Sequence, residues 1–212
     1  GTVTIPGKGN LRSLASVDGS TIYGVGADGA VARFTTAGNW LFKPPQAARA
    51  VFPQTNGTVL VLGGRGDNTQ IWRVHPPETS ASDSMPAPNA STGVGAPLGD
   101  RVFLTRPPAA IAVLRTRTLQ LAAPVTLAHR AIAVAASPSG DRAYVLFDST
   151  ASIAVVDSYQ NAVVASAPLP GRGRDVRVDP FGRDVLVRAA TGDSVWVISV
   201  GTDRVTQIVR SQ

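Results

Sequence analysis

Arginine and aspartate supply most of the charged side chains of this chain. Lysine occurs only at Lys8 and Lys43, and glutamate only at Glu78. The formal net charge at pH 7 is +6, and the isoelectric point is about 10.7. Guanidinium groups bind carboxylates and phosphates through paired hydrogen bonds. The arginines are therefore candidates for contact with an acidic protein, anionic lipid headgroups or phosphates.

The densest basic stretch is residues 171–188. The candidate partner-binding arginines are Arg172, Arg174, Arg177, Arg183 and Arg188, joined by Arg106 and Arg117 earlier in the chain. Nucleic-acid binding also needs aromatic side chains on which bases stack, and this stretch has only Phe181. We therefore expect a protein or a membrane surface, not nucleic acid. A solvated surface of arginine and aspartate pairs remains the alternative, because Asp175, Asp179 and Asp184 lie in the same stretch.

The stretch GVGADG (24–29) matches the glycine pattern of dinucleotide-binding proteins. That pattern requires a strand before it and a helix after it. Here an alternating apolar stretch, AVARF (30–34), follows and predicts another strand. We therefore interpret Ala27-Asp28-Gly29 as a hairpin turn.

Catalytic and metal-binding residue types are scarce. The chain has no cysteine and only two histidines, His75 and His129. A metal or haem site usually needs more ligands than these, and Met85 is a poor axial ligand in a proline-rich stretch. No G-x-S-x-G motif marks a serine nucleophile. We expect no catalytic residues, no metal and no cofactor.

Five glycine turns recur along the chain, and each is followed by a short apolar strand. Their glycines are Gly19, Gly57, Gly99, Gly140 and Gly182, at spacings of 38, 42, 41 and 42 residues. A further apolar strand is predicted after each turn, at AVARF (30–34), QIWRV (70–74), AIAVL (110–114), SIAVV (152–156) and SVWVI (194–198). With the strands before each turn and the more polar strands at 162–166 and 204–209, the repeat indicates four antiparallel strands per unit. Such a period is typical of the blades of a β-propeller.

The fourth repeat, SPSGDRAYVLFDSTASIAVVDSYQNAVVASAPLPGRG (137–173), resembles the YncE-like and surface-layer-type β-propeller repeats. Ser137-Pro138-Ser139-Gly140, Tyr144-Val145, Ile153 and Val155 to Asp157 occupy the places of their shared pattern. The match is good in the fourth and fifth repeats, partial in the first, and weak in the second and third. The resemblance implies an all-β propeller and an exported, periplasmic or other extracytoplasmic location.

We expect one propeller domain over 1–212, with repeats at about 11–46, 47–91, 92–129, 130–172 and 173–212. Residues 1–10 resemble the end of a repeat and predict an extra outer strand. The alternative is that the chain is part of a larger ring of six to eight blades, with flanking sequence lost. Residues 75–97 are rich in proline and serine, so we expect an irregular surface excursion in place of a fourth strand. Trp40 and Phe42 fall on a fourth strand, where they either pack under a neighbouring loop or dock a partner.

The function that fits these features is a non-catalytic, protein-binding scaffold. We expect an accessory subunit of a bacterial membrane-associated complex, with contact to anionic headgroups as a further option. The alternatives are a propeller hydrolase or lyase, or a glycan- or polymer-binding module, that uses aspartates gathered at the ring axis.

Overall fold

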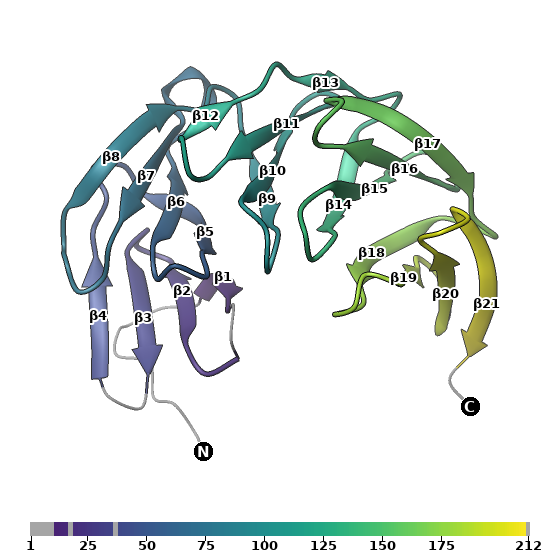
Figure 1. The fold of residues 1–212 in the computed structure, drawn as a ribbon, viewed down its shortest axis with the longest axis horizontal. Coiled ribbons are helices and arrows are strands. Elements are labelled where there is room, and N and C mark those ends of the chain that lie inside the picture. The colour runs from purple at the N-terminus through teal and green to yellow at the C-terminus, as the bar shows by residue number, and fades with distance from the viewer. Residues whose placement is uncertain (1–10, 17–18, 36–37, 211–212) are drawn as a thin grey trace. The chain divides into compact units, whose positions relative to one another are not determined.

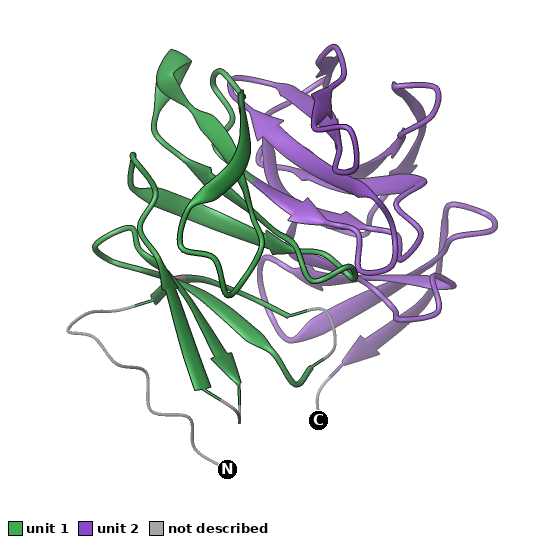
Figure 2. Ribbon diagram, turned by 60° about the vertical axis from the view of Figure 1, so that its left-hand side comes forward, with its two compact units in different colours: residues 1–92 green, residues 93–212 purple. Residues whose placement is uncertain are grey.

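The computed structural model describes residues 11–16, 19–35 and 38–210. All of the regular structure there is β-strand apart from a short 3₁₀ turn, η1 (Gly66–Asn68), and no helix in these ranges is long and apolar enough to cross a membrane. The chain divides into two compact units, residues 1–92 and 93–212 (Figure 2). The expected all-β class is confirmed. The predicted extra strand over 1–10 lies outside the described residues.

Unit 1 contains two antiparallel sheets, each with its strands in chain order (Figure 1). Sheet 1 consists of β1 (Leu11–Ala15), β2 (Ile22–Gly26), β3 (Val31–Thr35) and β4 (Gly38–Phe42). Sheet 2 consists of β5 (Ala48–Pro53), β6 (Val59–Gly63), β7 (Gln70–Val74) and β8 (Ala81–Pro86).

Unit 2 contains three further antiparallel sheets. Sheet 3 consists of β9 (Thr92–Gly95), β10 (Arg101–Arg106), β11 (Ala110–Arg115) and two short strands beside β11, β12 (Gln120–Leu121) and β13 (Val125–Thr126). Sheet 4 consists of β14 (Ala131–Ala136), β15 (Arg142–Phe147), β16 (Ser152–Asp157) and β17 (Ala162–Pro168). Sheet 5 consists of β18 (Gly173–Val178), β19 (Asp184–Ala189), β20 (Ser194–Ser199) and β21 (Arg204–Arg210).

The expectation for residues 75–97 is wrong in one respect. The segment is largely exposed, but it does not replace the fourth strand, because β8 within it pairs with β7 from Gln70 opposite Pro86 to Val74 opposite Ala81. Its last residues form β9, the first strand of sheet 3. The strand before the third turn, β9, is expected from the sequence, whereas weak hydrophobicity hid β8, a solvent-facing outer strand on which polar side chains are tolerated.

The cores lie between consecutive sheets of the same unit. In unit 2, Tyr144, Leu146, Ile153 and Val155 of sheet 4 pack against Val185, Val187, Trp196 and Ile198 of sheet 5. The other face of sheet 4, with Ala143, Val145, Ala154 and Val156, packs against Phe103, Ile111 and Val113 of sheet 3. We call the face of a sheet that packs on the next sheet its front face, and the opposite one its back face. Period-two alternation along each strand therefore supplies two packing faces per sheet.

The first hairpin of each sheet uses the same turn chemistry in sheets 1, 4 and 5. Three residues before the turn glycine stands a polar side chain, Ser16, Ser137 or Asp179. Ser137 Oγ accepts a hydrogen bond from the N–H of Arg142 at 3.1 Å, and Asp179 Oδ1 accepts one from the N–H of Asp184 at 2.8 Å. Ser16 Oγ likewise donates to the carbonyl oxygen of Thr21 at 2.7 Å. These bonds satisfy backbone groups at the turn. Serine and aspartate can both make them, so the turns have the same conformation although their sequences differ.

Gly140 shows what the turn requires of its glycine. Its φ is +77°, and a Cβ there would lie 2.9 Å from Ala96 Cβ and 3.1 Å from Arg101 Cβ. Gly192, in the turn between β19 and β20, has nearly the same φ of +75° but open space around it.

We predict that Gly140→Ala destabilises the protein more than Gly192→Ala. Both substitutions place a side chain at positive φ, which costs about 1 kcal/mol. Only Gly140→Ala also crowds a neighbouring sheet, which adds about 1–2 kcal/mol. Urea unfolding of both variants checks this, and equal midpoints for the two would show that the turn at Gly140 has room for a side chain.

Candidate interaction surface

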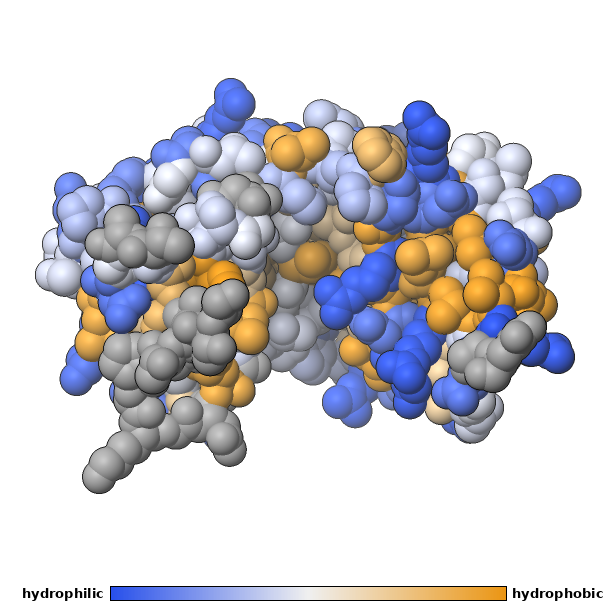
Figure 3. All heavy atoms as spheres, turned by 90° about the horizontal axis from the view of Figure 1, so that it is seen from below, coloured by the Kyte–Doolittle hydropathy of each residue, from blue (hydrophilic) through white to orange (hydrophobic). Residues whose placement is uncertain are grey.

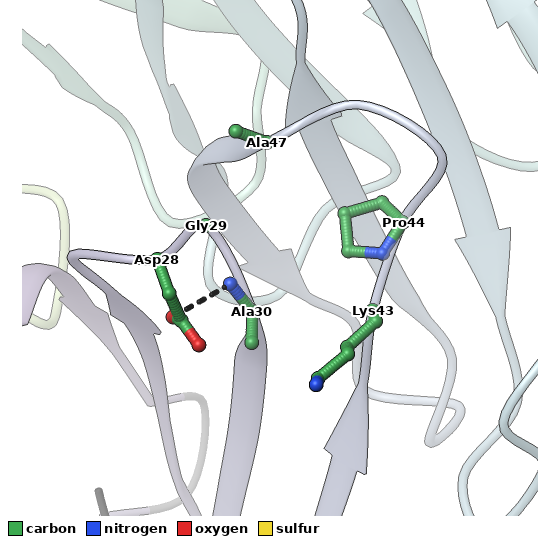
Figure 4. Close-up of a pocket in the computed structure, with 6 residues that line it drawn as sticks. All are labelled: Asp28, Gly29, Ala30, Lys43, Pro44 and Ala47. Atoms are coloured by element: carbon green, nitrogen blue, oxygen red, sulfur yellow. Dashed lines mark hydrogen bonds between the residues drawn. The ribbon is translucent and has the colours of Figure 1, made fainter. Parts of the chain in front are cut away.

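The GVGADG stretch forms the turn between β2 and β3, as interpreted from the sequence. The N–H of Gly29 donates to the carbonyl oxygen of Gly26 at 3.0 Å, and Asp28 Oδ1 accepts from the N–H of Ala30 at 3.0 Å (Figure 4). A Cβ on Gly29 would lie 2.5 Å from Ala47 Cβ. The hollow beside this turn, of about 260 Å³, is lined by Asp28, Gly29, Ala30, Lys43, Pro44 and Ala47. The glycine therefore permits close packing against the chain after β4, and the carboxylate is used to hold the turn.

The other aspartates also serve turns. Asp157 Oδ1 accepts from the N–H groups of Tyr159 and Gln160, each at 2.8 Å. Burial raises the pKa of Asp141, but hydrogen bonds from the Ser137 and Ser139 hydroxyls, its own backbone N–H and the charge of Arg142 together bring that pKa below its ordinary value. The N–H of Asp184 has the largest effect on Asp179 and, with those of Phe181 and Arg183, lowers its pKa. A carboxyl that acts as a general acid near neutral pH needs a raised pKa, which is the opposite shift.

We predict that Asp179→Asn lowers stability at neutral pH and that the difference from wild type shrinks as the pH falls below about 4. The folded pKa is depressed, so the carboxylate stabilises the protein above its unfolded pKa of about 3.9 and loses that effect on protonation. Thermal unfolding between pH 3 and pH 7 measures the effect. The control is Asp193→Asn, which changes the net charge equally at an exposed residue of the β19–β20 turn. Parallel pH profiles for the two variants would contradict the prediction.

The structure brings only some of the arginines of 171–188 together. Arg177 on β18 and Arg188 on β19 share one face of sheet 5, because Arg177 lies opposite Leu186 and Arg188 opposite Asp175. Arg172 precedes β18, Arg174 occupies the extra position of a bulge, and Arg183 lies in the turn after β18. The guanidinium of Arg183 sits 5.6 Å from the ring centre of Phe181.

The face that Arg177 and Arg188 share corresponds, in the register of the repeat, to the front face of sheet 4, so we call it the front face of sheet 5. Its apolar members are Leu186, Val195, Val197 and Val209, and in the register of the repeat these correspond to Tyr144, Ile153, Val155 and Ala167 on the front face of sheet 4. All four residues of sheet 4 are at most 2% exposed, whereas Leu186 is 37% and Val209 is 45% exposed. Sheet 5 therefore presents to solvent a set of positions that sheet 4 uses for its core.

Two arginines stand among these apolar residues. Arg177 takes the place of Ala135, and Arg188 takes the place of Leu146. Arg177 Nε lies 3.4 Å from Asp175 Oδ2, but the two side chains are 78% and 50% exposed, so this ion pair contributes little to stability. Figure 3 shows hydrophobic side chains beside strongly hydrophilic ones at the right of the molecule, the side on which Figure 1 places sheet 5. The surface combines apolar side chains with guanidinium N–H groups that can donate hydrogen bonds to a partner. This composition is found in protein interfaces.

Arg106 and Arg117 do not join this surface. They lie on sheet 3, at opposite ends of the β10–β11 hairpin, because Arg106 is opposite Ala110 and Arg117 follows the end of β11. Arg117 Nε is 3.9 Å from Asp100 Oδ2, and its side chain is 84% exposed.

Trp40 and Phe42 are not a docking surface. They are 6% and 2% exposed and belong to the core between sheets 1 and 2. Trp40 Nε1 donates to the carbonyl oxygen of Glu78 at 2.7 Å, and its ring stacks on that of Phe42 with centres 6.1 Å apart. Of the two alternatives that the sequence left open, packing beneath a neighbouring loop is correct, because the loop between β7 and β8 covers the indole.

We predict that Trp40→Ala destabilises the protein by about 3–5 kcal/mol, because it leaves a large cavity and an unpaired carbonyl group. The matched control is Leu41→Ala on the same strand, whose side chain is 50% exposed and should cost about 0.5 kcal/mol or less. Urea unfolding measures both. A small loss for Trp40→Ala would show that the indole is free of the core.

The two histidines lie in different units, and each contacts a residue of its own sheet. His75 Nδ1 is 3.0 Å from Ser82 Oγ, and the ring of His129 meets that of Phe147 edge to face. Across the ranges that the structure describes, no three histidine or acidic side chains are grouped as metal ligands.

Sequence reasoning missed Leu186, Val195, Val197 and Val209 as surface residues. Each belongs to an alternating apolar strand, which predicts burial. No signal within these strands separates them from the buried strands of sheet 4, because both sets have the same apolar alternation. Comparisons with protein-family models and with curated proteins found no match.

Proposed function

We propose that the chain is a β-propeller of the YncE-like and surface-layer type that acts as a non-catalytic, protein-binding scaffold. The five repeated four-stranded sheets and the front-to-back packing within each unit support the propeller. The repeat resemblance supports the family, and through it a periplasmic or other extracytoplasmic location. The role we assign is that of an accessory subunit in a bacterial membrane-associated complex.

The observation that carries the binding function is the front face of sheet 5. Leu186 and Val197 are cross-strand neighbours, and so are Val195 and Val209, so the apolar residues form one continuous stripe over three strands. Arg177 and Arg188 flank this stripe and supply hydrogen-bond donors. Burial of the stripe by a partner is favourable, and the arginines select a partner with carboxylates opposite them.

The hydrolase, lyase and glycan-binding alternatives have less support. The carboxylates of Asp28, Asp157 and Asp179 all accept hydrogen bonds from backbone N–H groups of their own turns. They are therefore occupied in fixing the hairpins that the fold repeats.

We predict that wild-type protein retains a stoichiometric partner from solubilised membranes of the source organism, and that Leu186→Glu loses it. A glutamate at this position removes apolar area from the stripe and pairs with Arg177 on the neighbouring strand, which withdraws that guanidinium from the partner's carboxylates, so we expect a loss of at least about tenfold in affinity. The matched control is Ile132→Glu on β14, which is 46% exposed and lies outside the front face of sheet 5. The double variant Arg177→Glu, Arg188→Glu should release the same partner.

Retention is measured by quantitative mass spectrometry after low- and high-salt washes, with circular dichroism to confirm that each variant is folded. Absence of any stoichiometric partner would overturn the proposed function. Equal retention by Leu186→Glu and Ile132→Glu would show that the partner binds elsewhere.

A further inference from the structure

The outer strand of sheet 5, β21, has no proline within it or directly beside it, whereas a proline lies in or within two residues of an outer strand of each of the other four sheets. Pro44 follows β4 closely, Pro86 ends β8, Pro124 separates β12 from β13, and Pro168 ends β17. Proline has no N–H, so it limits the pairing of a further strand with an exposed edge. The sequence from Arg204 to the end of the chain, RVTQIVRSQ, contains none.

β21 is also long and exposed, and it has one bulge, at Thr206, because Gln207 lies opposite Val197 and Val205 lies opposite Ile198. It spans seven residues, and six of them are exposed. Ile208 and Val209 are 47% and 45% exposed. Among the described residues β21 pairs only with β20, so its second edge presents a row of backbone N–H and C=O groups. Such an edge is a template for an added strand.

The ends of β21 restrict which strand can be added. Arg204 and Arg210 lie at the two ends, with uncharged residues between them. Antiparallel pairing of two copies of β21 about Gln207 would place Arg204 opposite Arg210 at both ends, and parallel pairing in register would place each arginine opposite its own copy. Like charges directly opposite each other destabilise a strand pair. The charge pattern therefore disfavours a second copy and favours a strand with acidic ends.

We propose that the free edge of β21 binds an extended segment of a partner protein by β-strand addition, and that this segment has acidic residues at its two ends and apolar or β-branched residues between them. The inference rests on the proposed protein-binding function and adds the chemistry of the segment that is bound. The main-chain hydrogen bonds supply affinity, and the carboxylates opposite Arg204 and Arg210 fix register and select the segment.

The test uses the full chain and a synthetic seven-residue peptide with glutamate at both ends and alternating valine and threonine between them. Backbone amide resonances of β21 are followed by NMR during titration to millimolar peptide. We expect the shifts to concentrate on β21, and a peptide with lysine at both ends to bind about tenfold more weakly, because two favourable charge pairs become repulsive. High salt should narrow that difference.

A charge-reversed protein provides the second arm. Arg204→Glu, Arg210→Glu should bind the lysine-ended peptide in preference to the glutamate-ended one. The control Arg115→Glu, Arg130→Glu makes the same change in net charge at exposed residues outside sheet 5 and should leave both affinities unchanged. A glutamate-ended peptide in which every internal backbone nitrogen is methylated should not bind, because neither of its edges can donate hydrogen bonds to the ladder.

Four outcomes overturn the inference. They are no shift at β21 at millimolar peptide, equal affinity for the two peptides, protection of every β21 amide from hydrogen exchange in the free monomer, and a dimer in light scattering that depends on β21. The third would show that the edge is already filled by this chain, and the fourth that a second copy fills it. Partner capture through the front face is measured separately, so failure of the peptide to bind leaves the proposed function standing, and loss of capture by Leu186→Glu does not depend on the peptide.

Discussion

Face-to-face packing of consecutive sheets is the interaction on which the rest of this structure depends. A four-stranded antiparallel sheet of five- or six-residue strands has two faces and cannot bury either by itself. In sheet 4, alternate residues of β15 serve opposite neighbours: Tyr144 and Leu146 face sheet 5, and Ala143 and Val145 face sheet 3. Sheet 5 has the same alternation, so its front face has a composition that suits packing although Leu186 and Val209 on it are exposed.

The turns hold these faces in register. A hairpin that shifted by one residue would exchange the two faces of a strand, so that core residues would face the wrong neighbour. Ser137 and Asp179 fix the first hairpin of sheets 4 and 5 through backbone bonds across the turn. At the last hairpin, Asn161 and Asp203 adopt φ of +52°, and the register shifts by one residue beside each of them. Asp28, Asp141, Asp157 and Asp179 are thus used to hold turns in place.

Exposed arginines, in contrast, lie at two distinct places on sheet 5, and neither pair holds a turn. Arg177 and Arg188 replace apolar residues of the packing face, where a further identical sheet would meet charge in its core. Arg204 and Arg210 lie at the two ends of β21, an outer strand with no proline in it or directly beside it. One place is a face and the other an edge, so the two proposals assign them different features of a partner: a surface with apolar area and carboxylates to the first, and an extended backbone to the second.

The sequence by itself determined the all-β class, the five repeats, the hairpin at Ala27-Asp28-Gly29 and the position of nearly every strand, because glycine turns and period-two alternation are local signals. It missed β8, whose exposed residues carry no apolar alternation. Only the tertiary structure decided which residues are buried. Trp40 and Phe42 lie on an outer strand yet belong to the core, because a loop 38 residues away covers the indole. Leu186 and Val209 have the pattern of core residues yet lie exposed, since burial depends on whether another sheet packs on that face and not on the strand itself.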